Sequence, residues 1–178
     1  ITRFIERKLR LKVNKAKSKV APSRECKFLG YTIGGKGQLR ISKESKARMT
    51  DRLKAVTKRN RGREFDAVIR ETNAFLRGWL NYYGLASAKV WLTETEAWLR
   101  RRLRCYRLKQ CKRRFAIAKF LMKSGLPEWR AWLLAMSRKG WYRMSVSPQA
   151  AEAMSNKWFA EMGLIPLVSP VGRNRVVP

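Results

Sequence analysis

Histidine is missing from this 178-residue chain, and acidic residues are scarce, with 12 Asp and Glu against 42 Lys and Arg. The absence of histidine excludes Ser-His and Cys-His catalytic pairs and HExxH zinc sites. The three cysteines, Cys26, Cys105 and Cys111, cannot form a four-ligand structural zinc site without help from carboxylates. Their odd number and wide spacing argue against a disulfide framework and therefore indicate a reducing compartment.

The few carboxylates do not form a pattern typical of two-metal catalysis, which needs clustered acids. The nearest pairs are Glu64 with Asp66 and Glu94 with Glu96, and residues two apart on a helix do not share a face. Both pairs stand at expected helix starts, where acids stabilise the helix dipole. We therefore predict no catalytic residue and no metal site in this chain.

Long hydrophobic runs are also missing. A typical apolar run, residues 131–136, falls far short of the roughly 20 residues that a membrane helix needs. No secretory signal is visible. The sequence begins with Ile1 rather than Met, in the middle of what resembles a strand or helix, and we interpret it as part of a longer protein.

What the chain has in excess is positive charge on a background rich in apolar residues. The formal charge is +30, yet 45% of the residues are hydrophobic, which a disordered basic tail would not show. Residues 1–63 carry a net +17, residues 64–99 a net −2, and residues 100–123 eleven basic side chains without an acid. Such a charge on a folded domain predicts a polyanionic partner.

Residues 1–41 are predicted to be rich in β-structure. Leu9, Leu11 and Val13 alternate with basic residues, as in a half-buried strand. A second apolar run, 27–33, precedes the glycine-rich turn 34–37 and a third run, 39–41, which together predict a β-hairpin.

From Ser42 onward the periodicity is helical. Ser42 is a suitable N-cap, and a helix is expected from there to about residues 60–62, a second over 65–83, and a third from Lys89 or Thr93 to 107. These three form a predicted small bundle. Further helices are expected over 115–122, over 128–137 after Pro127, and from Pro148 to Met162, before an irregular tail. The predicted fold is therefore mainly α with an N-terminal β-hairpin.

Basic and aromatic residues interleave most densely over residues 98–114. On a helix this sequence places a basic stripe beside an apolar one, a geometry suited to lying along a phosphate backbone. Arginine adds a planar fork that grips phosphate and stacks on bases. We interpret Trp79 and Trp98 as core residues, because they fall on the apolar stripes of their helices.

Several motifs resemble those of group II intron reverse transcriptases, also called maturases. Residues 65–85, which include Leu76-Arg77-Gly78-Trp79-Leu80-Asn81-Tyr82-Tyr83, resemble the family's maturase-specific region, with residues 60–63 and 98–106 fitting on either side. Residues 11–20 and 28–33 resemble the last strands of the family's palm. Residues 137–145 and 156–163 resemble its domain X, so that the resemblance covers nearly the whole chain.

The resemblance implies a distal palm over residues 1–41, a three-helix thumb over 42–107, an RNA-binding domain X over 108–165 and an irregular tail over 166–178. It places Lys17, Gly30 and Tyr31 near the nucleotide and primer. We expect the thumb and domain X to contact nucleic acid through Lys58, Arg59, Arg61, Arg63, Arg77, Arg100, Arg101, Arg104, Arg107, Lys109, Lys112, Arg113, Arg114, Lys119, Arg138 and Lys139. Reversing Arg101, Arg104 and Arg113 to Glu is expected to weaken RNA binding without unfolding the chain.

Implied partners are a group II intron RNA, an RNA template with its DNA primer, and the N-terminal finger and palm portion of the reverse transcriptase. Implied locations are the bacterial cytoplasm or an organelle. The family's catalytic Tyr-Ala-Asp-Asp motif is not in this chain, so polymerisation by the chain alone is not expected, and Mg²⁺ is expected only with the missing palm residues. At positions 108 and 111, where the family usually has Trp, the chain has Leu and Cys.

Two other interpretations stay open from the sequence. The chain could be the C-terminal half of a split, active RNA-directed DNA polymerase. It could also be a general basic structural RNA-binding protein, for which composition alone would suffice.

Overall fold

The computed structural model describes residues 2–14, 21–22, 25–35 and 37–168. Within them the chain is mainly helical with a small antiparallel sheet near the N-terminus, as predicted. In chain order the elements are α1 (Thr2–Arg7), β1 (Lys27–Phe28), β2 (Tyr31–Ile33), β3 (Leu39–Ile41), α2 (Lys43–Val56), α3 (Phe65–Tyr83), α4 (Lys89–Gln110), α5 (Arg114–Lys123), α6 (Glu128–Ala135), α7 (Trp141–Met144), α8 (Pro148–Ala153) and α9 (Asn156–Glu161).

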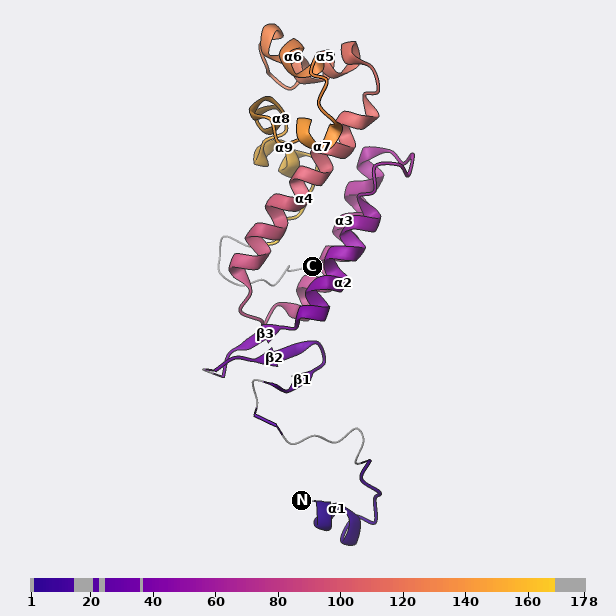
Figure 1. Ribbon diagram of the computed structural model, residues 1–178, viewed down its shortest axis with the longest axis vertical. Helices are drawn as coiled ribbons and strands as arrows, with labels where there is room; N and C mark the ends of the chain where they lie inside the picture. The colour runs from indigo at the N-terminus through magenta and orange to yellow at the C-terminus, as the bar shows by residue number, and fades with distance from the viewer. Residues whose placement is uncertain (1, 15–20, 23–24, 36, 169–178) are drawn as a thin grey trace.

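The body of the molecule is elongated. Helices α2, α3 and α4 run along its length, the sheet lies at one end of them, and α5 to α9 gather around the other end of α4 (Figure 1). The main core joins α2, α3 and α4 to the helices that follow through fully buried side chains that include Leu53 on α2, Leu76 on α3 and Leu99 on α4. Burying a leucine contributes about 1.5–3 kcal/mol to folding, so this core holds the helices together. The sheet packs through a smaller cluster of Ile41 with Tyr83 and Ala86.

The sheet has the order β1-β2-β3, with Phe28 opposite Tyr31 and Tyr31 opposite Ile41. The prediction of one strand over residues 27–33 was wrong, because the chain turns at Leu29 (φ 49°) and Gly30 (φ 80°). A Cβ on Gly30 would lie 2.7 Å from Ser45 Oγ and closer still to the Tyr83 hydroxyl. Glycine is therefore required both by the backbone and by the close approach of α2 and α3.

The strand predicted around Leu9, Leu11 and Val13 is not present. Residues 8–14 follow α1 in irregular conformation, and Leu9 and Leu11 are more than half exposed. Alternation alone does not make a strand, because a strand also needs a hydrogen-bonding neighbour and a surface to pack on.

The three-helix bundle was predicted closely. The Ser42 hydroxyl accepts a hydrogen bond from Ser45 N at 3.2 Å, as an N-cap does. Helix α3 spans the predicted residues, and Gly84 follows it. Helix α2 ends at Val56, four residues before the expected stop, and α4 continues to Gln110, so it crosses the 107/108 limit assigned to the thumb and domain X.

The single helix predicted from Pro148 to Met162 is two helices. Ser147 caps α8 as expected, but Met154 leaves the helical conformation, and the Ser155 hydroxyl accepts a hydrogen bond from Trp158 N to cap α9. Serine competes for backbone groups and so favours a new start over continuation. Pro127 is the N-cap of α6, which ends at Ala135, two residues before the expected end, and α7 is a short helix that the sequence did not predict.

Candidate nucleic-acid interface

Gly30 and Tyr31, which were assigned to the primer end by resemblance, connect the sheet to the helices. The Tyr31 hydroxyl donates to the Tyr82 carbonyl, the Tyr82 hydroxyl donates to the Leu29 carbonyl at 2.9 Å, and Ser42 N donates to the Gly30 carbonyl at 2.9 Å. Burial and the neighbouring tyrosines raise the pKa of Tyr31. These contacts give Gly30 and Tyr31 a structural role, and their assignment to the primer end stays a prediction. Lys17, the third residue of that set, lies outside the described residues.

The arginines of α4 are mostly engaged inside the protein. Arg100 forms an ion pair with Glu96 one turn earlier, with side chains only 18% and 15% exposed. The second oxygen of Glu96 accepts a hydrogen bond from Leu167 N at 3.3 Å. Glu96 therefore links α4 to the segment that follows α9, and Arg100 pairs with this carboxylate rather than presenting its charge to solvent.

Arg104 lies deeper. Its Nε donates to the Met154 carbonyl at 3.0 Å, and its guanidinium lies 5.7 Å from the ring centroid of Phe159. Burial and the charge of Arg100 lower the pKa of Arg104. Arg104 thus stabilises the connection between α8 and α9. The expectation that Arg104 can be changed to Glu without affecting the fold conflicts with these contacts.

Arg101 and Arg107 stack on aromatic rings. The guanidinium of Arg101 lies 3.9 Å from the ring centroid of Tyr142 on α7, and that of Arg107 lies 4.7 Å from Phe120 on α5. Stacking of this kind is worth about 0.5–2 kcal/mol. Both side chains are partly exposed, so each combines a packing role with some charge at the surface.

A second group of basic residues lies on the loop between α2 and α3. We call residues 58–63 the basic loop; it contains the predicted residues Lys58, Arg59, Arg61 and Arg63. Lys109 of α4 donates to the Asn60 side chain, and the Arg63 carbonyl accepts hydrogen bonds from Tyr106 Oη at 2.7 Å and from Gln110 Nε2 at 2.9 Å. The loop is therefore fixed to α4 along its length.

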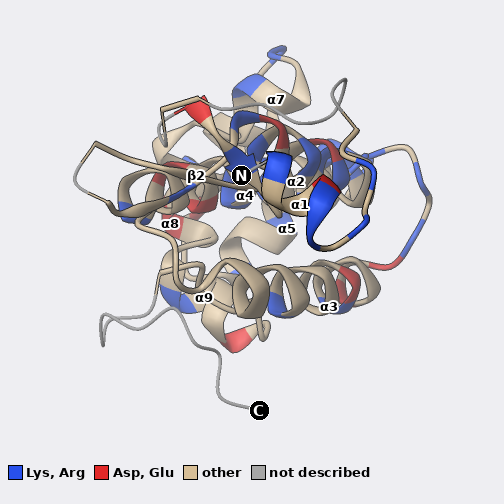
Figure 2. Cartoon of the chain, turned by 90° about the horizontal axis from the view of Figure 1, so that it is seen from below, with Lys and Arg blue, Asp and Glu red and all other residues tan. Residues whose placement is uncertain are grey.

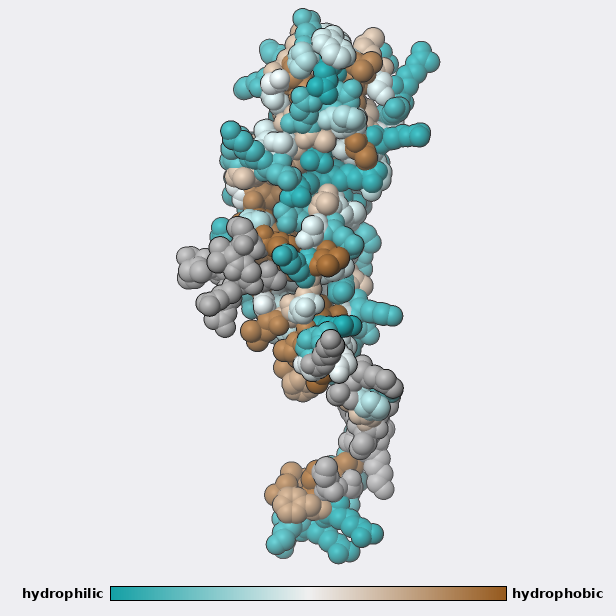
Figure 3. All heavy atoms as spheres, turned by 90° about the vertical axis from the view of Figure 1, so that its left-hand side faces the viewer, coloured by the Kyte–Doolittle hydropathy of each residue, from teal (hydrophilic) through white to brown (hydrophobic). Residues whose placement is uncertain are grey.

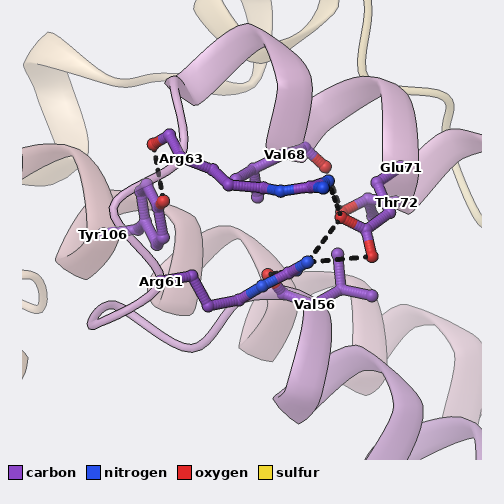
Figure 4. Close-up of polar contacts among 7 residues, drawn as sticks. All are labelled: Val56, Arg61, Arg63, Val68, Glu71, Thr72 and Tyr106. Atoms are coloured by element: carbon purple, nitrogen blue, oxygen red, sulfur yellow. Dashed lines mark hydrogen bonds and ion pairs between the residues drawn. The ribbon is translucent and has the colours of Figure 1, made fainter.

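One carboxylate orients two of the loop arginines. Arg61 and Arg63 each approach a Glu71 oxygen at 3.0 Å, and Arg61 also donates to the Val56 carbonyl at 2.8 Å (Figure 4). Burial alone would raise the pKa of Glu71, but the hydrogen bond from Arg61 and the charges of Arg61 and Arg63 outweigh it, so the pKa lies below its ordinary value. The single negative charge of Glu71 therefore faces two positively charged guanidinium groups, so the group as a whole keeps a net positive charge.

A third group lies where α4 gives way to α5. Lys112, Arg113 and Arg114 connect the two helices, Lys119 follows one turn into α5, and all four are exposed. We call these four residues the α5 cluster. Lys112 has φ 56°, a left-handed conformation in which glycine is more stable than a side-chain-bearing residue. A long basic side chain is thus kept at a position where backbone energy alone favours glycine.

The remaining predicted residues lie apart from these groups. Arg77 is exposed on α3, and Arg138 and Lys139 are exposed between α6 and α7. Seen along the long axis, basic residues cover much of α1, α2 and α4, whereas most of α3 is neutral (Figure 2). The structure thus brings the basic loop together with the C-terminal half of α4 but does not join every predicted base into one surface.

Two polar residues with structural roles were missed by the sequence analysis. Arg102 donates from Nε to Thr57 Oγ1 at 2.7 Å and from a terminal nitrogen to the Lys54 carbonyl at 3.1 Å, which ties the end of α2 to α4. Asn73 donates to the Gly163 carbonyl at 2.7 Å and accepts from Ile165 N at 3.1 Å. These contacts span 45 to 92 residues in sequence, so no local pattern could indicate them.

Within the part of the chain that the structure describes, no group of three or more His, Cys, Asp or Glu side chains is placed to hold a metal ion. The half-buried carboxylates Glu71 and Glu96 are already paired with arginines. Among the same residues, none of the helices has both the length and the apolar character needed to cross a membrane.

Comparison with known protein families finds a match in the middle of the chain. Residues 46–124 match the family model of the group II intron, maturase-specific domain. The match begins in α2, covers α3 and α4, and ends after α5, so it includes the basic loop and the α5 cluster. None of the curated proteins compared with the chain matches it. This segment is therefore similar to a maturase-specific domain, which supports a group II intron maturase function in splicing with intron RNA as the implied partner.

Proposed function

We propose that this chain binds a group II intron RNA through the basic loop and the α5 cluster and so assists folding of the intron for splicing. In this proposal the chain is the thumb and domain X portion of a group II intron reverse transcriptase. The observation that carries the proposal is that the matched segment, residues 46–124, contains the exposed basic residues of both the basic loop and the α5 cluster.

The charge balance of these two groups supports a polyanionic ligand. The α5 cluster lies in the segment 100–123, which has eleven basic residues and no acid. In the basic loop, one carboxylate, that of Glu71, faces both Arg61 and Arg63. Uncompensated cations on a fixed surface repel one another, and phosphate groups relieve that repulsion and release condensed counterions.

The experiment is a binding titration over a series of salt concentrations, with a folded group II intron RNA and an unrelated structured RNA of equal length. Purely electrostatic binding weakens steeply with salt and treats both RNAs alike. We expect the intron RNA to keep an advantage of about tenfold or more at high salt, which is about 1.4 kcal/mol. Superimposed curves would instead support a general basic RNA-binding protein.

A matched pair of triple variants locates the surface. Changing Lys112, Arg113 and Arg114 to Gln is expected to weaken intron binding and to reduce its salt dependence. Changing the exposed Lys43, Lys89 and Lys157 to Gln removes the same charge elsewhere and is expected to have a smaller effect. Equal effects of the two variants would mean that net charge, not the α5 cluster, governs binding.

A second role, gripping the template–primer duplex within a complete reverse transcriptase, is favoured by the surface near the sheet. Phe28 and Leu29 at the β1–β2 turn are 76% and 65% exposed, and hydrophobic surface gathers in the lower part of the helical body (Figure 3). Strand β1 pairs with β2 on one side, and a sheet edge with apolar neighbours suits coverage by further strands.

The N-terminal finger and palm portion would supply those strands, the catalytic aspartates and the Mg²⁺ that they bind. Mixing this chain with a separate fragment that carries these parts is expected to restore primer extension. The double variant Phe28→Ser with Leu29→Ser is expected to abolish the restored activity while leaving intron binding intact. A folded mixture without any primer extension would contradict the split-polymerase interpretation.

A further inference from the structure

A pocket of about 380 Å³ opens between the basic loop, α4 and α7. Its lining residues come from these three elements and from the end of α2, and are Thr57, Lys58, Arg59, Asn60, Arg102, Cys105 and Tyr142. The hydrogen bonds of Arg102 to Thr57 and to the Lys54 carbonyl fix the α4 side of the pocket. The pocket is therefore formed by anchored parts of the fold.

The cations of this pocket lack an acidic counterpart. Lys58, Arg59 and Arg102 line it, and among the described residues none of its lining side chains is a carboxylate. Arg59 donates to the Cys105 sulfur at 3.5 Å, whereas Arg102 donates to a hydroxyl and a carbonyl. Burial lowers the pKa of Arg102, Cys105 and Tyr142 offset part of that shift, and the charge of Arg59 adds a smaller lowering. An anion placed between these groups would relieve both lowering effects.

One wall of the pocket is aromatic. Tyr142 is 42% exposed, and the guanidinium of Arg101 lies over its ring at 3.9 Å from the centroid. The Arg101 Nε is buried without a hydrogen-bond partner among the described residues, so its contact with the ring holds it in place. The Arg101–Tyr142 pair is thus a preformed flat surface of the kind on which unpaired bases stack.

The size of the pocket exceeds what a phosphate group alone requires. At about 380 Å³ it falls within the range of about 300–1,000 Å³ in which proteins bind small organic ligands. A cationic side and an aromatic side in one such volume match the two ends of a nucleotide.

We infer that this pocket binds one unpaired nucleotide of an RNA strand, with its phosphate against Lys58 and Arg59 and its base against Tyr142. The inference deepens the proposed function and rests on it, because the strand is taken to be part of the bound intron RNA. It predicts that the chain reads single-stranded positions, such as a bulged or looped nucleotide, in addition to gripping phosphates.

The first test uses the full chain and a single-stranded RNA of about ten nucleotides that carries one 5-iodouridine. Ultraviolet irradiation is expected to form a crosslink that mass spectrometry maps to Tyr142. Tyr142→Leu is expected to remove the crosslink and to weaken binding of the strand about tenfold, as loss of one stacked base does. Trp129→Leu is the matched control, because Trp129 is an aromatic residue exposed elsewhere, on α6.

A second measurement identifies which part of the nucleotide is recognised. Uridine monophosphate, uridine and inorganic phosphate are each used as competitors for the labelled strand. We expect uridine monophosphate to compete best, and the double variant Lys58→Gln with Arg59→Gln to remove its advantage over uridine. Equal competition by inorganic phosphate and uridine monophosphate would show a phosphate site without base recognition and would overturn the inference.

The outcomes separate this inference from the proposed function. If wild-type protein prefers the intron RNA but the crosslink maps away from Tyr142 and Tyr142→Leu binds the strand like wild type, the pocket inference fails and the function stands. If intron preference is lacking but the crosslink and the competition are as expected, the pocket stands and the intron function fails. Circular dichroism of each variant confirms that it is folded.

Discussion

The arginines of α4 and the bases of the α5 cluster are neighbours in sequence but differ in what surrounds them. Arg100 and Arg104 are paired with a carboxylate and a carbonyl inside the protein. Arg113 and Arg114, a few residues later, are exposed. The sequence analysis treated both groups as one RNA-binding stripe. The comparison teaches that a run of arginines on a helix can divide into side chains that stabilise the fold and side chains that are free to contact a ligand.

The division follows from helical geometry. Helix α4 buries Leu99, Leu103 and Tyr106 on one face, and Arg100, Arg104 and Arg107 lie beside that stripe at a spacing of three or four residues. Long side chains at the border of a buried face cover apolar surface with their methylene groups and reach backbone oxygens with their guanidinium groups. The side chains of the α5 cluster point away from the buried face of α5, which is formed by Ile117, Ala118 and Leu121, and are exposed.

The variant Arg104→Glu gives the largest expected effect. It replaces the donor to the Met154 carbonyl with a carboxylate that faces that carbonyl in a partly buried place, which is expected to cost about 4 kcal/mol of unfolding free energy. Urea denaturation followed by circular dichroism measures this cost. Arg113→Glu, the matched control in the α5 cluster, is expected to stay within about 0.5 kcal/mol of wild type and to weaken intron RNA binding instead.

If Arg104→Glu were as stable as wild type, the contacts with Met154 and Phe159 would not be maintained in solution. If Arg113→Glu lost as much stability as Arg104→Glu, the α5 cluster would be part of the folded framework. Either result would remove the distinction between the two groups of arginines.

The next effect in size comes from Arg100→Gln. It leaves the Glu96 carboxylate partly buried beside a neutral amide, at an expected cost of about 2 kcal/mol. The double variant Glu96→Gln with Arg100→Gln removes both charges and is expected to recover part of that loss, as measured by urea denaturation. Arg70→Gln on the exposed side of α3 is the control and is expected to leave stability unchanged. If the stability losses from changing Glu96 and Arg100 simply added up in the double variant, the two side chains would not interact.

Local patterns predicted much of the fold because its helices depend on local signals. The cap at Ser42, the apolar stripe of α3 and the glycine after it are all readable within a few residues. What the sequence could not show were contacts between distant segments. Gly30 was assigned to the primer end, but its role here is to let Tyr83 and Ser45 approach the sheet, and that depends on residues 15 and 53 positions away.

The sequence predicted which residues of the candidate site are basic, but not which of them are exposed and able to contact a ligand. Charge density marked residues 98–114 correctly as a basic segment. Whether each arginine is exposed depends on partners such as Met154 and Tyr142, which come from α7 and the end of α8. The pocket beside the basic loop could not be predicted either, because three segments far apart in sequence form it.

Glu71 is connected both with structural arginines and with RNA-binding ones, because the loop arginines that it anchors are also candidate RNA contacts. Its pKa is lower in the folded chain than its ordinary value of 4.5, so its charge stabilises the fold above that value, and the stabilisation is lost as the pH falls through the folded pKa. Glu71→Gln is therefore expected to cost about 1 kcal/mol near neutral pH.

Thermal or urea unfolding of wild type and Glu71→Gln across a pH series tests this expectation. The difference in stability is expected to shrink toward zero as the pH falls below the folded pKa of Glu71, where the wild-type carboxyl is also neutral. A difference that stays constant from neutral to acidic pH would show that the amide disturbs packing rather than removing a charge.

The smallest expected effect on stability distinguishes the two arginines that share Glu71. Arg61 is 26% exposed and also donates to the Val56 carbonyl, whereas Arg63 is 55% exposed and its side chain pairs with Glu71 alone among the described residues. Arg63→Gln is expected to cost about 0.5 kcal/mol, and Arg61→Gln about twice as much because a backbone acceptor loses its donor. For RNA binding the order is expected to reverse, since the more exposed Arg63 can leave Glu71 for a phosphate. Parallel urea denaturation and intron-binding titrations of the two variants measure both orders; the same order in both would mean that even at the basic loop the arginines act on RNA only through the stability of the fold.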